Sequence, residues 1–318
     1  MGPAASDWTR RTARSDLARA PRLTRLAYAA LALAYLQAVL GAVVRITGSG
    51  MGCGDHWPRC HGRWFPPLDR VDLVIEVTHR YVAATLTLAV LALLFTAWRA
   101  RGSPGIAGRG GVVRPAGAAA LLVVAAALLG AATVKLELHA AAVVIHLALA
   151  MALIAALALA AVRSRLLAGQ QARAGTSVRT VRASTAAAII EIIAVLMGGA
   201  TANVAGAAAS CVGFPHCREI TVGGTPLIVQ AGHRILAIAL LLHLFGTVLA
   251  LRKRSEPPGT KLWARIALAT ALAQILVAAA MVESGLPLYL RVLHQALGTL
   301  VWLMVFVFAA VAREPERA

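Results

Sequence analysis

Eight long apolar segments restrict what this chain of 318 residues can fold into more than any other feature. They cover residues 26–46, 73–98, 115–134, 140–162, 184–204, 229–251, 266–282 and 290–312. Each is close to the ~20 residues that a helix needs to cross a bilayer. Only 14% of the residues are charged, whereas a soluble domain carries roughly 25%. The sequence therefore predicts an all-α, polytopic membrane protein with eight transmembrane helices.

The positive charge is distributed unevenly along the chain. Of the 31 Lys and Arg residues, 22 lie in segments that share one side of the membrane: 1–25, 99–114, 163–183, 252–265 and 313–318. An excess of Lys and Arg marks the cytoplasmic side. We therefore predict a multi-pass plasma membrane protein with both termini in the cytoplasm. The net charge of +18 then reflects topology and suits anionic lipid, and it does not indicate nucleic-acid binding.

All four cysteines fall in the two long loops predicted on the opposite, outer side. Disulfides are allowed there because that side is oxidising. Cys53 and Cys60 enclose six residues, and Cys211 and Cys217 enclose five. We expect each pair to be a disulfide that closes a short loop, while a redox role for the first pair stays open.

The chain also contains an internal repeat. The matching pairs are Gly41–Gly48 with Gly199–Gly206, Glu76–Arg80 with Gln230–Arg234, and His146 with His294. Each copy has an even number of spans, so both copies have the same orientation. We predict two four-helix bundles, 26–162 and 184–312, related by a pseudo-twofold axis along the membrane normal. The segment 163–183 is the predicted cytoplasmic linker between them.

Four of the nine histidines occupy equivalent positions in the repeat: His79, His146, His233 and His294. Each lies about six residues into its span, or ~9 Å below the outer surface at the rise of an α-helix. Two imidazoles facing each other across a bundle core can be the axial ligands of a haem iron. Zinc or copper would lack further ligands in these spans. The alternative is interhelical hydrogen bonding, but equal depths in two diverged halves favour two haems.

The residues beside these histidines differ between the halves. Glu76 precedes His79 by three residues, on the same helix face, where the second half has Gln230. We interpret Glu76 as a general base, with orientation of an imidazole as the alternative. Arg80 and Arg234 are our candidates for binding haem propionates, and contact with lipid headgroups is the other reading.

Four further ionisable residues receive no assigned role. His56 and His61 lie beside the first cysteine pair, and we expect solvated loop histidines. His243 and Glu191 lie within spans and have no equivalent in the other half, so buried hydrogen bonds are the expectation for both.

Three motifs of the first half resemble those of the bacterial-type haem A synthases: Arg45–Cys53, Trp57–Gly62 and Glu76–Arg80. The resemblance covers about residues 26–312, including the eight spans and the repeat. Members of this family oxidise a ring methyl of haem O to a formyl group, through successive hydroxylations, and so make haem A for terminal oxidases.

The resemblance implies a division of labour between the halves. The substrate haem O would lie between His79 and His146, with Glu76 as the catalytic carboxylate. A haem B cofactor would lie between His233 and His294. The resemblance also implies that the pair at 53 and 60 is the outer-loop disulfide of the family.

Two other functions compete with this reading. A di-haem electron-transfer protein would use the same histidines. It would not need a carboxylate, Glu76, in the first half at the position where the second half has an amide, Gln230. A transporter with parallel repeats would carry its site near the midplane, whereas the matched histidines lie near the outer face. The expected partners are the haem O substrate and membrane lipid. A partnership with haem O synthase is compatible with these features, and the sequence identifies no electron acceptor.

Overall fold

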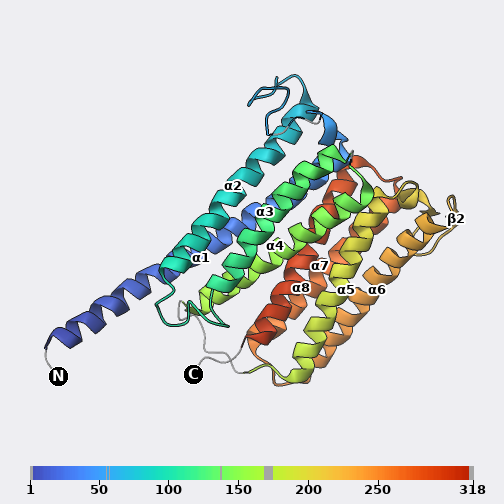
Figure 1. Cartoon of the computed structure of the whole chain (residues 1–318). Coiled ribbons are helices and arrows are strands. Elements are labelled where there is room, and N and C mark those ends of the chain that lie inside the picture. Colours follow the sequence, from blue (N-terminus) through green and yellow to red (C-terminus); the bar gives the residue numbers. More distant parts are fainter. Residues whose placement is uncertain (1–2, 55, 57, 137, 168–174, 315–318) are drawn as a thin grey trace.

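The computed structural model describes residues 3–54, 56, 58–136, 138–167 and 175–314, and for residues 3–20, 166 and 167 the backbone alone. Eight long helices dominate it (Figure 1): α1 (Pro3–Ile46), α2 (Val71–Arg99), α3 (Val113–Lys135), α4 (Ala140–Leu167), α5 (Val178–Asn203), α6 (Thr225–Arg252), α7 (Pro258–Glu283) and α8 (Leu288–Arg313). Each contains a stretch long and apolar enough to cross a membrane. The predicted all-α, multi-pass membrane fold is confirmed.

Several helices extend beyond the predicted spans. Helix α1 begins within the predicted cytoplasmic tail, and α7 begins at Pro258 rather than residue 266. Helix α5 begins at Val178, where the side chain of Ser177 accepts a hydrogen bond from the backbone N–H of Thr180. These added residues are too polar to be counted as apolar spans, but the cap of Ser177 favours helix at the start of α5, and Pro258 is compatible with the first turn of α7. Helices α4 and α5 thus occupy both ends of the predicted linker, whose residues 168–174 lie outside the described ones.

The helices contact one another in two groups of four. In the first group α1 and α3 each contact α2 and α4, and in the second α5 and α7 each contact α6 and α8. The groups meet where α1 contacts α8, α4 contacts α5, and α4 contacts α8. If α1 is exchanged with its equivalent α5, and α4 with its equivalent α8, the same three contacts between the groups result. The contacts agree with two four-helix bundles, and the pseudo-twofold axis between them stays a prediction.

Turn geometry repeats between the two groups. Leu138, before α4, and Leu286, before α8, both have left-handed backbone conformations, with φ of 58° and 62°. Such a conformation is unusual for leucine. Gly48 and Gly206 are left-handed at equivalent positions, each before a single 3₁₀ turn, Ser49–Met51 or Ala207–Ala209. The second of these loops also holds two short antiparallel strands, β1 (Cys211–Val212) and β2 (Glu219–Ile220).

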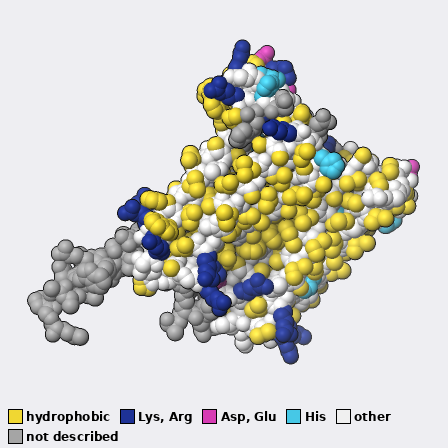
Figure 2. Space-filling view, in the orientation of Figure 1, with side chains coloured by type: hydrophobic (Ala, Val, Ile, Leu, Met, Phe, Trp, Pro, Cys, Tyr) yellow, Lys and Arg dark blue, Asp and Glu magenta, His cyan; other side chains and the backbone are white. Residues whose placement is uncertain are grey.

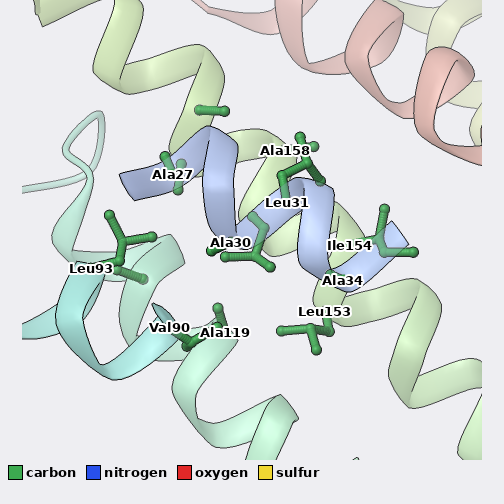
Figure 3. Packing of buried hydrophobic residues seen from close by; sticks show 14 of the residues in the cluster. Ala27, Ala30, Leu31, Ala34, Val90, Leu93, Ala119, Leu153, Ile154 and Ala158 are labelled. Carbon is green, nitrogen blue, oxygen red and sulfur yellow. The ribbon is translucent and has the colours of Figure 1, made fainter. Parts of the chain in front are cut away.

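Small side chains bring α1 close to its neighbours (Figure 3). Ala27, Ala30 and Ala34 lie along one face of α1, in a buried cluster with Leu93 of α2 and Ile154 of α4. Lipid tails are as apolar as leucine, so helices in a membrane associate largely through close packing, which small residues permit.

The outside of the bundle carries a wide apolar belt (Figure 2). Leu88, Leu121 and Leu242 in this chain are 64–76% exposed, which suits contact with lipid. Lys and Arg side chains gather at the end of the bundle where the described termini lie, and on the loop between α1 and α2. We call the end opposite the termini the outer end. The assignment of the other end to the cytoplasm stays a prediction.

Candidate functional site

The second pair of histidines lies ring against ring. His233 of α6 and His294 of α8 have ring centroids 6.3 Å apart, with their planes at 86°. Two imidazoles that bind opposite sides of one metal ion through bonds of about 2.0 Å hold their ring centres roughly 6 Å apart. Nδ1 of His233 lies 2.9 Å from the carbonyl oxygen of Ala194. A hydrogen bond from Nδ1 to a carbonyl orients a ligating histidine and leaves Nε2 for the metal.

The first pair consists of His79, on α2, and His146, on α4. The side-chain amide nitrogen of Gln37, on α1, lies 3.1 Å from Nε2 of His79. Nδ1 of His79 and Nδ1 of His146 are buried and have no hydrogen-bond partner among the described residues. Each ring therefore retains an unsatisfied nitrogen in an apolar core.

Two glutamines accompany the two pairs. Gln37 contacts His79, and the amide nitrogen of Gln274, on α7, lies 3.1 Å from Nδ1 of His294. The amide oxygens of both glutamines are buried and unpaired. Sequence analysis missed both residues, although an amide inside an apolar span is a signal that could have found them.

All buried side-chain nitrogen and oxygen atoms left unpaired in the described part of the chain belong to these two sites: Gln37 Oε1, His79 Nδ1, His146 Nδ1 and Gln274 Oε1. An unsatisfied buried polar atom costs about 1–3 kcal/mol, and such atoms gather where a protein binds a ligand or performs chemistry. Paired imidazoles with spare polar atoms in an apolar bundle core fit bis-histidine haem sites.

Glycines on the neighbouring helices make room for the imidazoles. A Cβ atom added to Gly41 or Gly130 would lie 3.1 or 3.2 Å from Cε1 of the adjacent histidine ring. At Gly198 it would lie only 2.8 Å from Cε1 of His233. By this contact Gly198, rather than Gly199 as aligned from the sequence, corresponds to Gly41. Gly199 instead approaches Leu147 of the first group.

Glu76 connects the first site to the outer loop above it. Its side chain is buried, with 4% exposed. One carboxylate oxygen accepts a hydrogen bond from the guanidinium of Arg80 at 2.5 Å, and the other accepts one from the backbone N–H of Cys53 at 2.9 Å. Arg80 also donates to the backbone carbonyls of His56 and Pro58, at 2.9 and 3.2 Å. Glu76 and Arg80 together hold the loop against α2.

The equivalent residues of the second half hold the second loop in the same way. The amide of Gln230 accepts a hydrogen bond from the hydroxyl of Ser210 at 2.9 Å and donates to the carbonyl of Ala208 at 3.0 Å. Arg234 donates to the carbonyls of Gly213 and Cys211 at 2.7 and 2.8 Å. The guanidiniums of Arg80 and Arg234 are thus engaged by the loops, and their propionate role stays a prediction.

The structure joins the cysteines in the expected pairs, Cys53–Cys60 and Cys211–Cys217. Both disulfides lie in the loops that the α2 and α6 residues hold. His61, in the first loop, is exposed, and its Nε2 lies 3.0 Å from the carbonyl of Gly52.

The two unmatched ionisable residues of the spans lie in the second group. Nε2 of His243 lies 2.9 Å from the carbonyl of Ala183, the kind of hydrogen bond expected for it. Glu191 is buried in α5, with 5% exposed. A cavity of about 450 Å³ lies elsewhere, between the two groups near the terminal end, and its lining includes Tyr28 and Arg165 but none of the four matched histidines.

Comparison with known proteins agrees with this picture. Residues 24–306 match the COX15-CtaA family, described as cytochrome oxidase assembly protein. The chain is 30% identical over 264 residues to the heme A synthase of Geobacillus thermodenitrificans, which covers 80% of each chain. A segment of 62 residues is 50% identical to the heme A synthase of Geobacillus kaustophilus, over 20% of each chain.

Another relative is longer than this chain and is not named as a heme A synthase. The chain is 32% identical over 311 residues to the protoheme IX farnesyltransferase of Thermus thermophilus, which covers 91% of this chain and 48% of that one. The chain therefore spans about half the length of the Thermus proteins it matches.

Proposed function

Since the chain belongs to the COX15-CtaA family of cytochrome oxidase assembly proteins, we propose that it is a haem A synthase that oxidises a ring methyl of haem O to a formyl group. Its similarity to two heme A synthases supports this. The structural observation that carries the proposal is the gathering of unpaired buried polar atoms at two pairs of imidazoles.

The first half is the proposed substrate site, with haem O between His79 and His146. When haem O is bound, its conjugated ring can accept electrons from the methyl carbon, so that a water molecule can attack there. Glu76 takes the proton from this water as a general base. Its carboxylate is fixed for this task by Arg80 and by the backbone of Cys53.

The second half is the proposed cofactor site, with haem B between His233 and His294. The carbonyl of Ala194 orients the first of these rings, and the amide of Gln274 contacts the second. Bound there, haem B would relay the electrons removed from the methyl group, one at a time, to an electron acceptor outside the chain. Gln230 carries no charge, which suits a site that holds a cofactor and moves no proton.

We also propose that both termini lie in the cytoplasm and that the protein works beside a haem O synthase in the plasma membrane. The distribution of Lys and Arg supports the orientation. The Thermus protein named as a protoheme IX farnesyltransferase contains, in about half of its length, a segment similar to 91% of this chain. Its name supports direct passage of an apolar product between the two activities.

Purified protein, co-expressed with a haem O synthase, tests the proposal through its optical spectrum and its extracted haems. We expect low-spin bis-histidine bands, with haem B together with haem O or haem A. His294→Ala should lose haem B, whereas His146→Ala should lose haem O and haem A and keep haem B. Unmodified haem B alone in the wild-type protein would indicate the di-haem electron-transfer function instead.

A further inference from the structure

Two arginines lie at the outer end of the boundary between the two helix groups. Arg45 lies in the last turn of α1 and Arg291 in the first turn of α8, and these helices are in contact. The contact between these helices brings two positive charges to the outer end of the same boundary. One nitrogen of Arg45 donates a hydrogen bond to the carbonyl of Ala202, at the end of α5, at 3.1 Å.

No carboxylate of a described residue forms an ion pair with either arginine, although four other arginines form such pairs. Both side chains are half-buried. Two like charges brought together away from bulk water raise the free energy of the folded state. An anion bound between them would remove that cost.

The pair lies one helical turn outward from both histidine sites. Gln37, Gly41 and Arg45 follow one another at intervals of four residues, so they share one face of α1. The first two of them contact the imidazole of His79. Arg291 precedes His294 by three residues on α8, again on one face.

We propose that Arg45 and Arg291 bind a propionate carboxylate of the haem held by His233 and His294. The hydrogen bond from Arg45 to Ala202 shows that this side chain of the first half reaches into the second. The second site is then incomplete without the first half of the chain. This assignment rests on the proposed function, and it replaces Arg234 as the main propionate ligand there, since Arg234 is engaged by loop carbonyls.

Guanidinium chemistry fits this role. A guanidinium binds a carboxylate through two parallel, charge-assisted hydrogen bonds. Unlike an ammonium group, it keeps its charge when partly buried and has a fixed planar set of donors. Two guanidiniums on opposite helices can therefore fix both the position and the direction of one carboxylate.

A comparison of haem B with its dimethyl ester tests the proposal. The full-length protein carries His79→Ala, so that only the second pair of histidines loads, and binding is followed by low-spin absorbance. We expect haem B to bind at least tenfold more tightly than the ester. Adding Arg45→Gln or Arg291→Gln should weaken haem B about tenfold, which is ~1.4 kcal/mol, and leave the affinity for the ester within about twofold.

Matched variants make the result decisive. Arg63→Gln, at an exposed position of the first outer loop, should retain the full preference for haem B. Equal affinity for haem B and ester in the parent protein would overturn the proposal, as would loss of the preference in Arg234→Gln but not in Arg45→Gln. If neither haem nor ester binds, the proposed function fails, and this assignment fails with it.

Discussion

The carboxylate of Glu76 and the guanidinium of Arg80 form a buried ion pair, 2.5 Å apart and one helical turn apart on α2. The equivalent residues of the second half, Gln230 and Arg234, hold their loop without such a pair. An amide is therefore sufficient to hold an outer loop on its helix. The negative charge of Glu76 is the feature that loop packing does not require.

The first prediction concerns this charge. Glu76→Gln should keep an acceptor for the N–H of Cys53, and therefore the fold and the haem content. Haem A formation should fall by about 100-fold or more, the usual scale for loss of a general base. Extracted haems and thermal unfolding measure the two effects. Gln230→Glu is the matched control and should leave haem A formation unchanged. Normal haem A from the Glu76→Gln variant would leave Glu76 a structural role only.

The second prediction concerns the glycines that face the imidazoles. Gly198→Ala adds a carbon 2.8 Å from Cε1 of His233, which forces the ring to move. Low-spin haem per protein at the second site should therefore fall severalfold, and Gly130→Ala should act similarly on the first site. Gly246→Ala, where an added Cβ meets nothing within 4 Å, should keep full haem content. Equal haem content in all three variants would contradict the close approach.

The third prediction concerns the contact between the helix groups. The indole N–H of Trp302, on α8, donates to the carbonyl of Met151, on α4, at 2.9 Å, and the indole is 6% exposed. Trp302→Phe should lower stability by about 1 kcal/mol or more, because the carbonyl loses its buried partner. The change appears as a lower Tm in detergent. Trp98→Phe, at a half-exposed position, should leave the Tm nearly unchanged. A Tm equally unaffected in both would show that this bond adds nothing.

The fourth prediction concerns pH. Burial alone would raise the pKa of Glu256, between α6 and α7, but hydrogen bonds from Ser177 and Thr180 outweigh it and lower the pKa. A carboxyl with a lowered folded-state pKa stabilises the protein above its unfolded pKa, about 4.3, and this contribution disappears as the pH falls through the folded pKa. Glu256→Gln should therefore lower the Tm at pH 7.

The loss in that variant should begin to shrink as the pH falls below the unfolded pKa of about 4.3, and it should vanish only once the pH has fallen through the lowered folded pKa of Glu256. Tm values from pH 3.5 to 7.5 measure this, with the exposed Glu219→Gln as control. A loss of Tm that does not change with pH would show that the hydrogen bonds, and not the charge, stabilise this turn.

Much of the site could be predicted by counting along the chain. The depth of each matched histidine follows from the helical rise, and the repeat assigns His79 to one half and His233 to the other. An amide inside an apolar span marks both glutamines as unusual, but nothing in the sequence shows which face of α1 or α7 meets an imidazole. Position alone makes Arg80 a candidate propionate ligand, and this role stays a prediction; the sequence does not show that Glu76 and loop carbonyls also engage its guanidinium.

The sequence by itself determined the eight helices and the two halves. Hydrocarbon offers no partner for backbone N–H and C=O groups, so an apolar segment of ~20 residues must satisfy them internally as a helix. Only the tertiary structure decided which groups of distant segments meet, as Gln37 meets His79 and Arg45 meets the carbonyl of Ala202. Those contacts depend on how each helix is rotated about its own axis and packed against its neighbours, which hydropathy does not encode.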